Sequence, residues 1–585
     1  MIPAEIYSIE ERRINGVFYT PDFLAEYLVK KVLHYKSSNS IISVLDPACG
    51  DSQLLRYFSK EISLKKECES RLKIFGIDKD INAIISSTAK FSDIKPTNII
   101  SKFIHADGLF PTDKNESELS WNQLREELNL TKGFDAILSN PPWGADMSEY
   151  STALLNCNFT LARGQFDIYN LFVESIIKNL ANDGIYALVL PDSVFSQEQS
   201  RFRGFLARNT KIHLIARLGE KIFSEINRAC AIIIGSKAQI TNEHQVECFR
   251  LSSDYKKKIL ANELFLEDVE KELSHKVPQI RFCENQNFSF DIDLKIGEQN
   301  VFNKIQNVGI SLSQVVENTR GAEISKKGIA CKCPSCEHWL PYPKAVIPKC
   351  YHCGNILKLD EIITEKIIIN HSGVGNFKLK VGEDLYRFTS ISKSWINTLK
   401  KGINYKNLSI YQGEKILVRK TGVGVTASID YDNSITNQVV YILKLRANFV
   451  HKLTTEFVLA ILNSRAITYY LIKKYGENEW KTHPYLTQTM LIGLPFPQID
   501  FKSKLTQGYI QQITDLIKNE VVDSNAKNIS KQTDILIERI VAKLFGLTEK
   551  DYEVIFETLN TAEPLIPIKR LLNITPKEIF NINGI

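Results

Sequence analysis

Short apolar runs alternate with helical stretches along the first 242 residues of the chain. Each run ends at a polar or turn-forming cluster, and the clearest runs are residues 41–45, 72–77, 134–138 and 185–190. Between them, apolar side chains recur with helical spacing, as in residues 25–32 and 169–180. This alternation predicts an α/β domain with a mostly parallel, doubly wound sheet. In such sheets, ligands bind beyond the carboxyl ends of the strands.

The pattern changes after residue 242. Residues 243–302 are rich in charge and have helical spacing, which predicts a helical connector. Apolar strands return within residues 303–500, which we interpret as a second, α+β domain. Residues 501–585 have helical periodicity, and Gly546 is expected to cap one of these helices at its carboxyl end.

The composition is that of a globular, water-soluble protein. Hydrophobic residues make up 44% and charged residues 24% of the 585 positions, a chain too long for one ordinary core. No apolar run approaches the roughly 20 residues that span a bilayer. The first residues also lack the basic stretch and apolar block of a secretory signal. We therefore expect a cytoplasmic protein that does not associate with membranes.

The basic residues are distributed unevenly. Between Val301 and Lys420 there are 19 Lys+Arg and 9 Asp+Glu, a balance of +10, so with a net charge of +6 the remainder carries −4. A basic block in an otherwise acidic chain is typical of a surface that binds a polyanion. A solvated surface with a chance excess of lysine would give the same count, so charge alone leaves both interpretations open.

The most specific motif directly follows the apolar run 134–138. An exocyclic amine of a nucleobase is a poor nucleophile because its lone pair is delocalised into the ring. An asparagine side-chain oxygen and the next backbone carbonyl can accept both amine N–H groups, and prolines fix their direction. An aromatic ring beside them offers a face for an extruded base. The alternative is an ordinary loop with two prolines and a core tryptophan. The candidate residues are Asn140, Pro141, Pro142 and Trp143.

Three aspartates precede this motif, each at the end of an expected strand. Asp46 opens a segment of small residues, where a ligand can approach the backbone before a helix begins. Asp78 stands where an acidic residue typically holds ribose hydroxyls, and Asp107 is suited to accept from an adenine amino group. Any one aspartate is more often a cap or turn residue, but three in this order favour a ligand site. The candidate ligand-binding residues are Asp46, Pro47, Ala48, Gly50, Asp78 and Asp107.

Five of the eleven cysteines crowd between Cys331 and Cys353. Four of them form two CxxC knuckles that are 13 residues apart, within about residues 331–354: Cys333, Cys336, Cys350 and Cys353. Four thiolates at this spacing suit a tetrahedral zinc ion with no open position, and therefore a structural site. Reduced surface cysteines are the alternative, which is disfavoured because exposed free thiols are reactive. Cys331 or His352 could replace one of the four ligands.

In these motifs the chain resembles the gamma class of amino-group DNA methyltransferases, which contains the TaqI-like and Eco57I-like enzymes. Similar elements include the N-terminal cofactor motif at residues 16–21 and the aspartate–tyrosine–phenylalanine element at residues 167–172. In the glycine motif, Asp51 stands where a second glycine is frequent. The resemblance implies a Rossmann-like catalytic domain over residues 1–242, which binds S-adenosylmethionine and methylates N6 of a flipped-out adenine. It adds Tyr19, Thr20 and Pro21 as cofactor-binding residues and Phe223 as the residue that stacks on the flipped base.

The second domain resembles a TaqI-like specificity domain. The similar elements are residues 415–422, 459–464 and 494–497, in that order. The resemblance implies a target-recognition domain over residues 303–500 that binds double-stranded DNA, with the zinc ribbon as an insertion near its start. Arg419 and Lys420 are its candidate DNA contacts.

The sequence thus predicts a site-specific adenine-N6 DNA methyltransferase that acts as a monomer in a restriction–modification or phage-defence system. A cognate nuclease or other defence-system subunits are candidate partners. Methyltransferases of RNA or of protein glutamine also carry Asn-Pro-Pro-aromatic, but they usually lack so long a recognition domain. A bifunctional restriction–methylation enzyme is disfavoured because the cofactor motif begins at Gly16 and the C-terminal helices show no convincing Asp…Glu-x-Lys constellation. The intact residues 140–143 argue against a catalytically idle DNA-binding module.

Overall fold

The computed structural model contains two compact units, the first ending at Ile296 and the second beginning at Gly297. None of the helices in the described part of the chain is long and apolar enough to cross a membrane. The described residues are 20–36, 41–64, 72–92, 99–112, 116–145, 147–150, 158–223, 228–324, 328–343, 348–358, 362–373, 375–400, 403–475, 485–522, 527–561 and 566–581.

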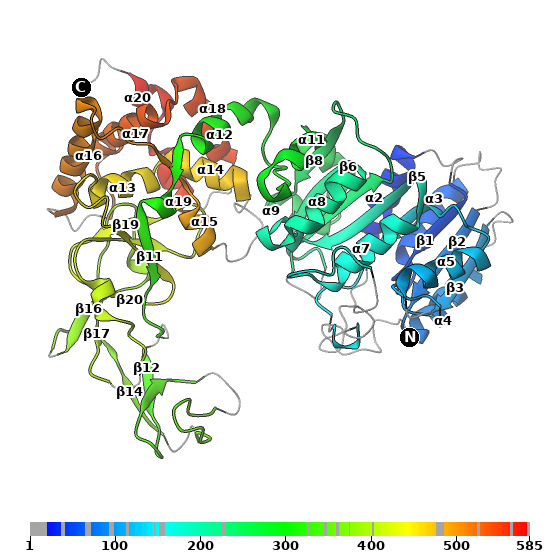
Figure 1. Ribbon diagram of the computed structural model, residues 1–585, viewed down its shortest axis with the longest axis horizontal. Helices are drawn as coiled ribbons and strands as arrows, with labels where there is room; N and C mark the ends of the chain where they lie inside the picture. Colours follow the sequence, from blue (N-terminus) through cyan, green and yellow to red (C-terminus); the bar gives the residue numbers. More distant parts are fainter. Residues whose placement is uncertain are drawn as a thin grey trace. The chain divides into compact units, whose positions relative to one another are not determined.

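The first unit is built on a nine-stranded mixed sheet, with the strand order β3-β2-β1-β4-β5-β7-β6-β8-β9 (Figure 1). Strands β1 to β5 are parallel, whereas β7 is antiparallel to both β5 and β6. The strands are β1 (Ser43–Asp46), β2 (Leu72–Asp78), β3 (Ile99–His105), β4 (Phe134–Ser139), β5 (Leu180–Pro191), β6 (Lys211–Gly219), β7 (Cys230–Ser236), β8 (Gln245–Arg250) and β9 (His275–Pro278).

Helices cover both faces of this sheet, which explains why its central strands are apolar along their whole length. All four residues of β1 and all seven of β7 are buried. In Figure 1, α7 and α8 lie on one face and α2 lies on the other. The helices are α2 (Asp22–Tyr35), α3 (Gln53–Leu64), α4 (Ile81–Ser92), α5 (Ser117–Glu127), α7 (Ile168–Asn179), α8 (Ser200–Asn209), α9 (Ser253–Leu260), α10 (Leu266–Leu273) and α11 (Gln279–Glu284).

The strand order reverses between β1 and β4, and this reversal positions the candidate site. From β1 the chain builds outward through β2 to β3, and it then returns to add β4 on the other side of β1. The loops that leave β1 and β4 therefore diverge, and a crevice opens between them at the carboxyl edge. The predicted α/β class with a doubly wound sheet is confirmed.

Residues 243–302 differ from the expected helical connector. They contain α9, α10 and α11, but also β8 and β9, which extend the sheet of the first unit. Strand β8 pairs in parallel with β6 and buries Val246, Cys248 and Phe249. The charged residues around it lie largely on exposed helices, so the short apolar strand is concealed in the sequence pattern.

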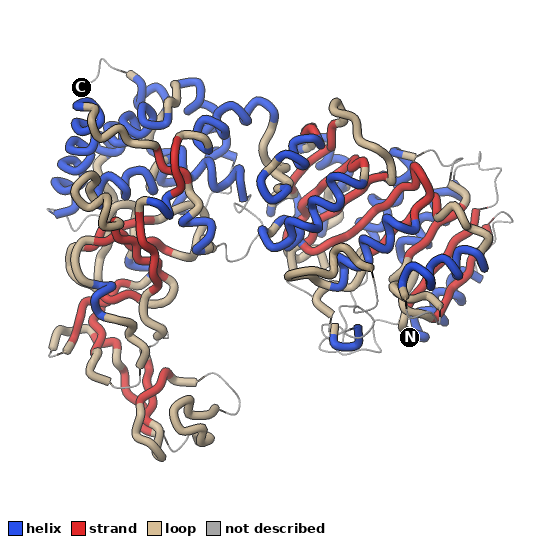
Figure 2. Tube along the Cα trace, viewed as in Figure 1, coloured by secondary structure: helices blue, strands red, loops and turns tan. Residues whose placement is uncertain are grey.

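The second unit combines four small sheets with a group of helices, which Figure 2 shows gathered at one end of the unit. Its strands are β10 (Gly309–Ser311), β11 (Val316–Arg320), β12 (Ile329–Lys332), β13 (Trp339–Pro341), β14 (Ile363–Lys366), β15 (Ile368–Ile369), β16 (Asn376–Lys380), β17 (Ser394–Asn397), β18 (Lys415–Arg419), β19 (Ala427–Asp430), β20 (Ile435–Thr436), β21 (Val440–Leu445) and β22 (Pro495–Pro497). Its helices are α12 (Gln299–Gln306), α13 (Thr455–Leu462), α14 (Arg465–Tyr475), α15 (Gln488–Ile492), α16 (Lys504–Val522), α17 (Lys531–Phe545), α18 (Glu549–Thr561), α19 (Ile566–Lys569) and α20 (Pro576–Phe580).

The start and the end of the expected second domain meet in one small sheet. Strand β10 pairs antiparallel with β22, so the chain enters and leaves this domain at the same place. The sheets between them follow the orders β11-β21-β18-β19, β13-β12-β14 and β15-β17-β16-β20. Helix α17 ends where the sequence predicts, with Gly546 in the left-handed conformation at a φ of 64°.

Buried ion pairs connect the elements of the second unit. The Asp430 carboxylate on β19 binds the ammonium groups of Lys415 on β18 and Lys380 on β16, each at 2.7 Å, and so links two sheets. Although burial opposes ionisation, the two lysines hold the pKa of Asp430 below its usual value. At the helical end, buried Arg465 binds Asp534 and Glu538 of α17, each at 2.9 Å. Breaking such a pair leaves a buried charge uncompensated, so these contacts specify how the elements assemble.

Candidate functional site

The chain turns sharply after β1. The buried Asp46 carboxylate accepts the backbone N–H of Ala48 at 3.1 Å, and Gly50 follows with a φ of 49°, which favours glycine. The N–H of Cys49 donates to the carbonyl of Ile77 at 2.9 Å. This hydrogen bond ties the turn to the end of β2, so the first two predicted strand ends lie together.

Asp78 closes β2 and holds the same turn. Its carboxylate accepts the N–H of Gly50 at 2.7 Å and the N–H of Asp80 at 2.9 Å. Burial raises the pKa of Asp78 above its usual value. An ionised carboxylate has about four acceptor positions, so two backbone bonds leave room for two further donors, such as a pair of hydroxyl groups.

Asp107 follows β3 and is more fully engaged than Asp78. Its carboxylate accepts the N–H of Leu109 at 2.8 Å and the hydroxyl of Tyr150 at 3.0 Å, and it pairs with the Lys79 ammonium at 3.0 Å. Burial and the nearby Asp107 charge raise the pKa of Tyr150 to about 12, so its hydroxyl stays protonated. These partners fix the carboxylate and leave it fewer free acceptor positions.

Gly108 lets the turn after β3 pack directly against the turn after β1. A Cβ at this position would lie 2.0 Å from the carbonyl oxygen of Pro47 and 2.7 Å from the ring of Phe172. No side chain fits there without movement of the backbone. The sequence showed a glycine next to Asp107 but gave no sign of this close approach.

The Asn140–Trp143 loop begins beside the Asp46 turn because β4 pairs with β1. The hydroxyl of Ser139, the last residue of β4, donates to the Asp46 carboxylate at 2.9 Å. Burial raises the pKa of Asp46 to about 7, although this bond and the one from Ala48 oppose the shift. Pro141 is buried, whereas Asn140 and Pro142 are partly exposed. One hydrogen bond therefore joins the first aspartate to the start of the most specific motif.

The two predicted stacking residues contact each other. The rings of Trp143 and Phe223 meet edge to face, with centroids 5.4 Å apart and planes at 90°. Trp143 is 1% exposed and Phe223 is 4% exposed, so neither ring presents an open face to solvent. The structure thus brings together two residues that are 80 positions apart in the sequence.

Two side chains that sequence reasoning did not select hold the end of this loop. Both carboxylate oxygens of Asp167 accept the N–H of Gly144 at 2.9 Å, and the same aspartate caps α7. The Arg228 guanidinium donates to the carbonyl of Trp143 at 3.3 Å. Asp167 belongs to a motif that the resemblance had identified, whereas nothing in the sequence around Arg228 indicated a role.

A buried Asp192–Arg217 pair fixes the strands that carry Phe223. Asp192 follows β5, and the Arg217 guanidinium on β6 donates to both of its carboxylate oxygens, at 2.7 and 2.6 Å. The Pro191-Asp192 strand end was visible in the sequence, but its partner lies 25 residues further along the chain. Such bidentate pairs restrict geometry more than single ion pairs do.

The N-terminal cofactor motif is described only in part. Tyr19 lies outside the described residues. Thr20 is buried, and the carbonyl of Pro21 accepts the N–H groups of Leu24 and Ala25 at 3.0 and 2.9 Å. Proline fixes the backbone at the start of α2, where a free N–H is not needed.

The four predicted metal ligands converge in the ribbon around β12 and β13. The sulfur atoms of Cys333 and Cys353 are 3.8 Å apart, those of Cys336 and Cys350 are 3.7 Å apart, and all four lie within 4.8 Å of one another. Tetrahedral zinc with Zn–S bonds of about 2.3 Å requires sulfur separations of about 3.8 Å. The geometry therefore suits a four-thiolate zinc site.

The two spare candidates do not belong to this four-sulfur group. Cys331 lies in β12, where its side chain is buried with Leu340 and Leu357 in the ribbon core. The His352 ring stacks on that of His338, with centroids 3.6 Å apart. Ligand atoms of both histidines lie within 4.8 Å of Cys336.

Arg419 and Lys420 belong to the second unit and lie at the end of β18. The Arg419 guanidinium donates to the hydroxyl of Thr421 at 3.2 Å, and the Lys420 ammonium lies 5.7 Å from the ring centre of Tyr485. Both side chains are partly exposed. They are positioned by backbone pairing on both sides of β18, with β19 and β21.

Two family models match the chain. Residues 5–311 match the model described as N-6 DNA Methylase, and residues 378–496 match the model described as TaqI-like C-terminal specificity domain. A curated relative, the EcoEI methylase subunit of a type I restriction enzyme from Escherichia coli, is 24% identical over 239 residues, or 39% of this chain. The match covers 44% of that relative, so the chain spans less than half of its length.

Among solved structures, the type IIL restriction-modification enzyme MmeI in complex with DNA has a TM-score of 0.55 at 11% identity, over 97% of this chain and 81% of that chain. The methyltransferase subunit of a type I restriction-modification system from Streptococcus thermophilus has a TM-score of 0.35 at 18% identity, over 47% of this chain and 58% of that chain. The likeness to MmeI supports the fold.

Replacing Gly108 with alanine should disturb the packing of the turns after β1 and β3, because the new Cβ overlaps the Pro47 carbonyl. We expect the free energy of unfolding to fall by about 1–3 kcal/mol, as for other overpacked sites. Gly297→Ala is the control, since a Cβ there meets no atom within 4 Å. Urea denaturation of the full chain measures both, and an unchanged midpoint for Gly108→Ala would contradict the described packing.

Proposed function

Because the chain belongs to the N-6 DNA methylase family, we propose that it transfers a methyl group from S-adenosylmethionine to N6 of adenine in double-stranded DNA. The observation that carries this proposal is the Ser139–Asp46 hydrogen bond, which joins the candidate cofactor turn to the candidate acceptor loop. The match to a TaqI-like specificity domain supports DNA as the substrate. A role in restriction–modification is consistent with the relatives described above.

The residues at the carboxyl edge fit S-adenosylmethionine in their chemistry. When bound, this cofactor supplies an activated methyl group on a cationic sulfonium. Asp78 retains acceptor positions for ribose hydroxyls, and the Asp46 carboxyl group is placed to offset positive charge. The residues that would hold the cofactor are Thr20, Pro21, Asp46, Pro47, Ala48, Gly50, Asp78 and Asp107, together with Tyr19, which lies outside the described residues.

Asn140 and Pro141 would bind and orient the target amine. The side-chain oxygen of Asn140 and the carbonyl of Pro141 accept the two amine N–H groups, which frees the nitrogen lone pair for attack on the methyl carbon. The C–S bond breaks as the N–C bond forms, so the thioether departs neutral. Asp167 and Arg228 act as positioning residues, because they hold the loop at Gly144 and Trp143.

Base stacking requires the contact between Trp143 and Phe223 to open. In the structure each ring occupies space that an extruded adenine would need. We propose that the two rings protect the site from water before DNA binds, and that they separate to receive the base. Burial of both faces of adenine then replaces the aromatic contact that is lost.

The second unit would recognise the DNA sequence. Arg419 and Lys420, on the edge of a rigid sheet and within the basic segment of the chain, are the proposed DNA contacts. We propose a structural zinc ion at Cys333, Cys336, Cys350 and Cys353, which stabilises a ribbon with a very small apolar core. Action as a monomer, with a cognate nuclease or defence subunits encoded elsewhere, stays a prediction.

Asn140→Ala should reduce the rate of methyl transfer by about 100-fold or more, the usual effect of removing one preorganised hydrogen-bonding group from an active site. Affinity for S-adenosylmethionine should change little, because Asn140 serves the acceptor base. Single-turnover transfer of labelled methyl groups to duplex DNA measures the rate. Asn303→Ala, at an exposed position of α12, is the matched control. Transfer by Asn140→Ala within tenfold of the wild-type rate would count against the proposal.

Affinity for S-adenosylmethionine should rise between pH 6 and pH 8. Burial sets the pKa of Asp46 at about 7, so the carboxyl group is mostly neutral at pH 6, whereas a cationic ligand favours the ionised form. Each pH unit below 7 should then weaken binding by up to about tenfold. Calorimetric titrations of wild type and Asp46→Asn test this, since the variant should bind weakly without this pH dependence. The same slope in both proteins would exclude Asp46 as its origin.

The full chain should contain one zinc ion, and Cys353→Ser should lose it. Cys353 is the exposed member of the four-thiolate group, so its replacement removes a ligand with little effect on core packing. Cys331→Ser and Cys283→Ser should retain the metal, because neither belongs to that group. Elemental analysis after dialysis against a mild chelator measures the content. Retention of zinc by Cys353→Ser would contradict the assigned ligands.

A further inference from the structure

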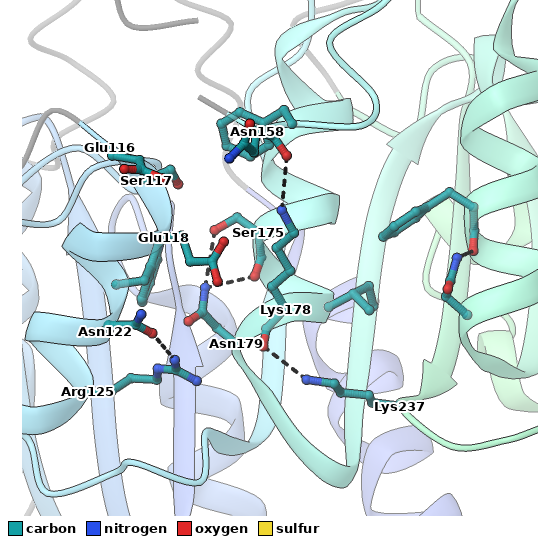
Figure 3. A pocket seen from close by; sticks show the side chains of 15 residues that line it. Glu116, Ser117, Glu118, Asn122, Arg125, Asn158, Ser175, Lys178, Asn179 and Lys237 are labelled. Carbon is teal, nitrogen blue, oxygen red and sulfur yellow. Dashed lines mark hydrogen bonds between the residues drawn. The ribbon is translucent and has the colours of Figure 1, made fainter. Parts of the chain in front are cut away.

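A groove lies on the helical face of the first unit, between α5, α7 and α8 (Figure 3). Its volume is about 380 Å³, within the range of small-molecule sites. It is separate from the proposed methyl-transfer site: α7 begins at the catalytic loop with the Asp167 cap, but its last turn, around Lys178 and Asn179, lines the groove. Eleven residues at 1.5 Å each place these two ends of α7 about 16 Å apart.

Two cations face each other across this groove. Figure 3 shows the side chains of Arg125, from α5, and Lys237, from the segment after β7, pointing toward one another. Within the described part of the chain, neither makes an ion pair. The Lys237 ammonium donates instead to the carbonyls of Lys178 and Leu180, at 3.0 and 2.8 Å. Burial lowers the pKa of Lys237, and the charge of Arg125 lowers it further.

The groove also has more hydrogen-bond donors than acceptors at this end. Trp121 is 3% exposed and lines the groove, and its indole N–H has no acceptor among the described residues. The Nε–H of Arg125 is likewise buried without an acceptor. Native structures rarely leave buried N–H groups unpaired, so these donors indicate a missing acceptor. The acidic side chains of the groove, Glu116 and Glu118, come from the first turn of α5 and the residue before it.

We infer that this groove binds a small phosphomonoester of about nucleotide size. Its phosphate would lie between Arg125 and Lys237 and accept from Trp121, while its flat body would pack against the apolar side chains of Phe159 and Phe205. A dianionic phosphate matches two cations and several donors, whereas a carboxylate would leave one cation unneutralised. The inference does not rest on the proposed methyl transfer, because the groove uses none of the residues assigned to that reaction.

Phenyl phosphate is a suitable probe because it has a flat ring and a phosphate but no adenosine, and so does not compete for the proposed cofactor site. Calorimetric titration into the full chain, without DNA or cofactor and at constant ionic strength, should give saturable one-site binding. Phenol should not bind. The Arg125→Gln/Lys237→Gln double variant should bind at least about tenfold more weakly, as expected for loss of two charge-assisted contacts.

Lys132→Gln is the matched control, since Lys132 is an exposed lysine of the same unit that does not line the groove. It should bind phenyl phosphate like the wild type. If the double variant does not fold, Lys237→Gln alone provides the comparison, with a weaker but measurable loss. Equal binding by wild type and the groove variants, or no binding by the wild type, would overturn the inference. Either result would leave the test of methyl transfer unaffected.

Discussion

The hydrogen bond from Ser139 to Asp46 is the contact on which the functional site depends. It joins the ends of two strands that are neighbours in the sheet but more than 90 residues apart in the chain. Because these strands are parallel, their loops leave at the same edge, one as the turn around Gly50 and the other as the Asn140–Trp143 loop. The bond sets the distance between methyl donor and acceptor amine in the proposed reaction, which gains most from alignment.

The rest of the site restricts these two loops from outside. Asp78 and the glycine at position 108 press on the first loop, while Asp167 and Arg228 hold the far end of the second. Almost all of these contacts involve backbone atoms. Loops held in this way can present chemistry at the edge of a sheet without large conformational cost when a ligand arrives.

Much of this arrangement could be predicted from the sequence, because each strand end carried a polar residue that the sheet then brought to one edge. The aspartates at 46, 78 and 107 and the two cysteine knuckles are examples of local signals. The partners of long-range contacts could not be predicted in the same way. Arg228 and the edge-to-face packing of Trp143 on Phe223 depend on the register of β5, β6 and β7, and β8 was concealed among charged helices.

The most direct test of the account is long-read modification mapping of DNA from cells that express the protein, beside cells that express Asn140→Ala. The account predicts N6-methyladenine in one defined sequence motif with the wild type and its absence with the variant. Equal methylation in both strains, or no new DNA mark in either, would contradict the claim that residues 140–143 present adenine for methylation.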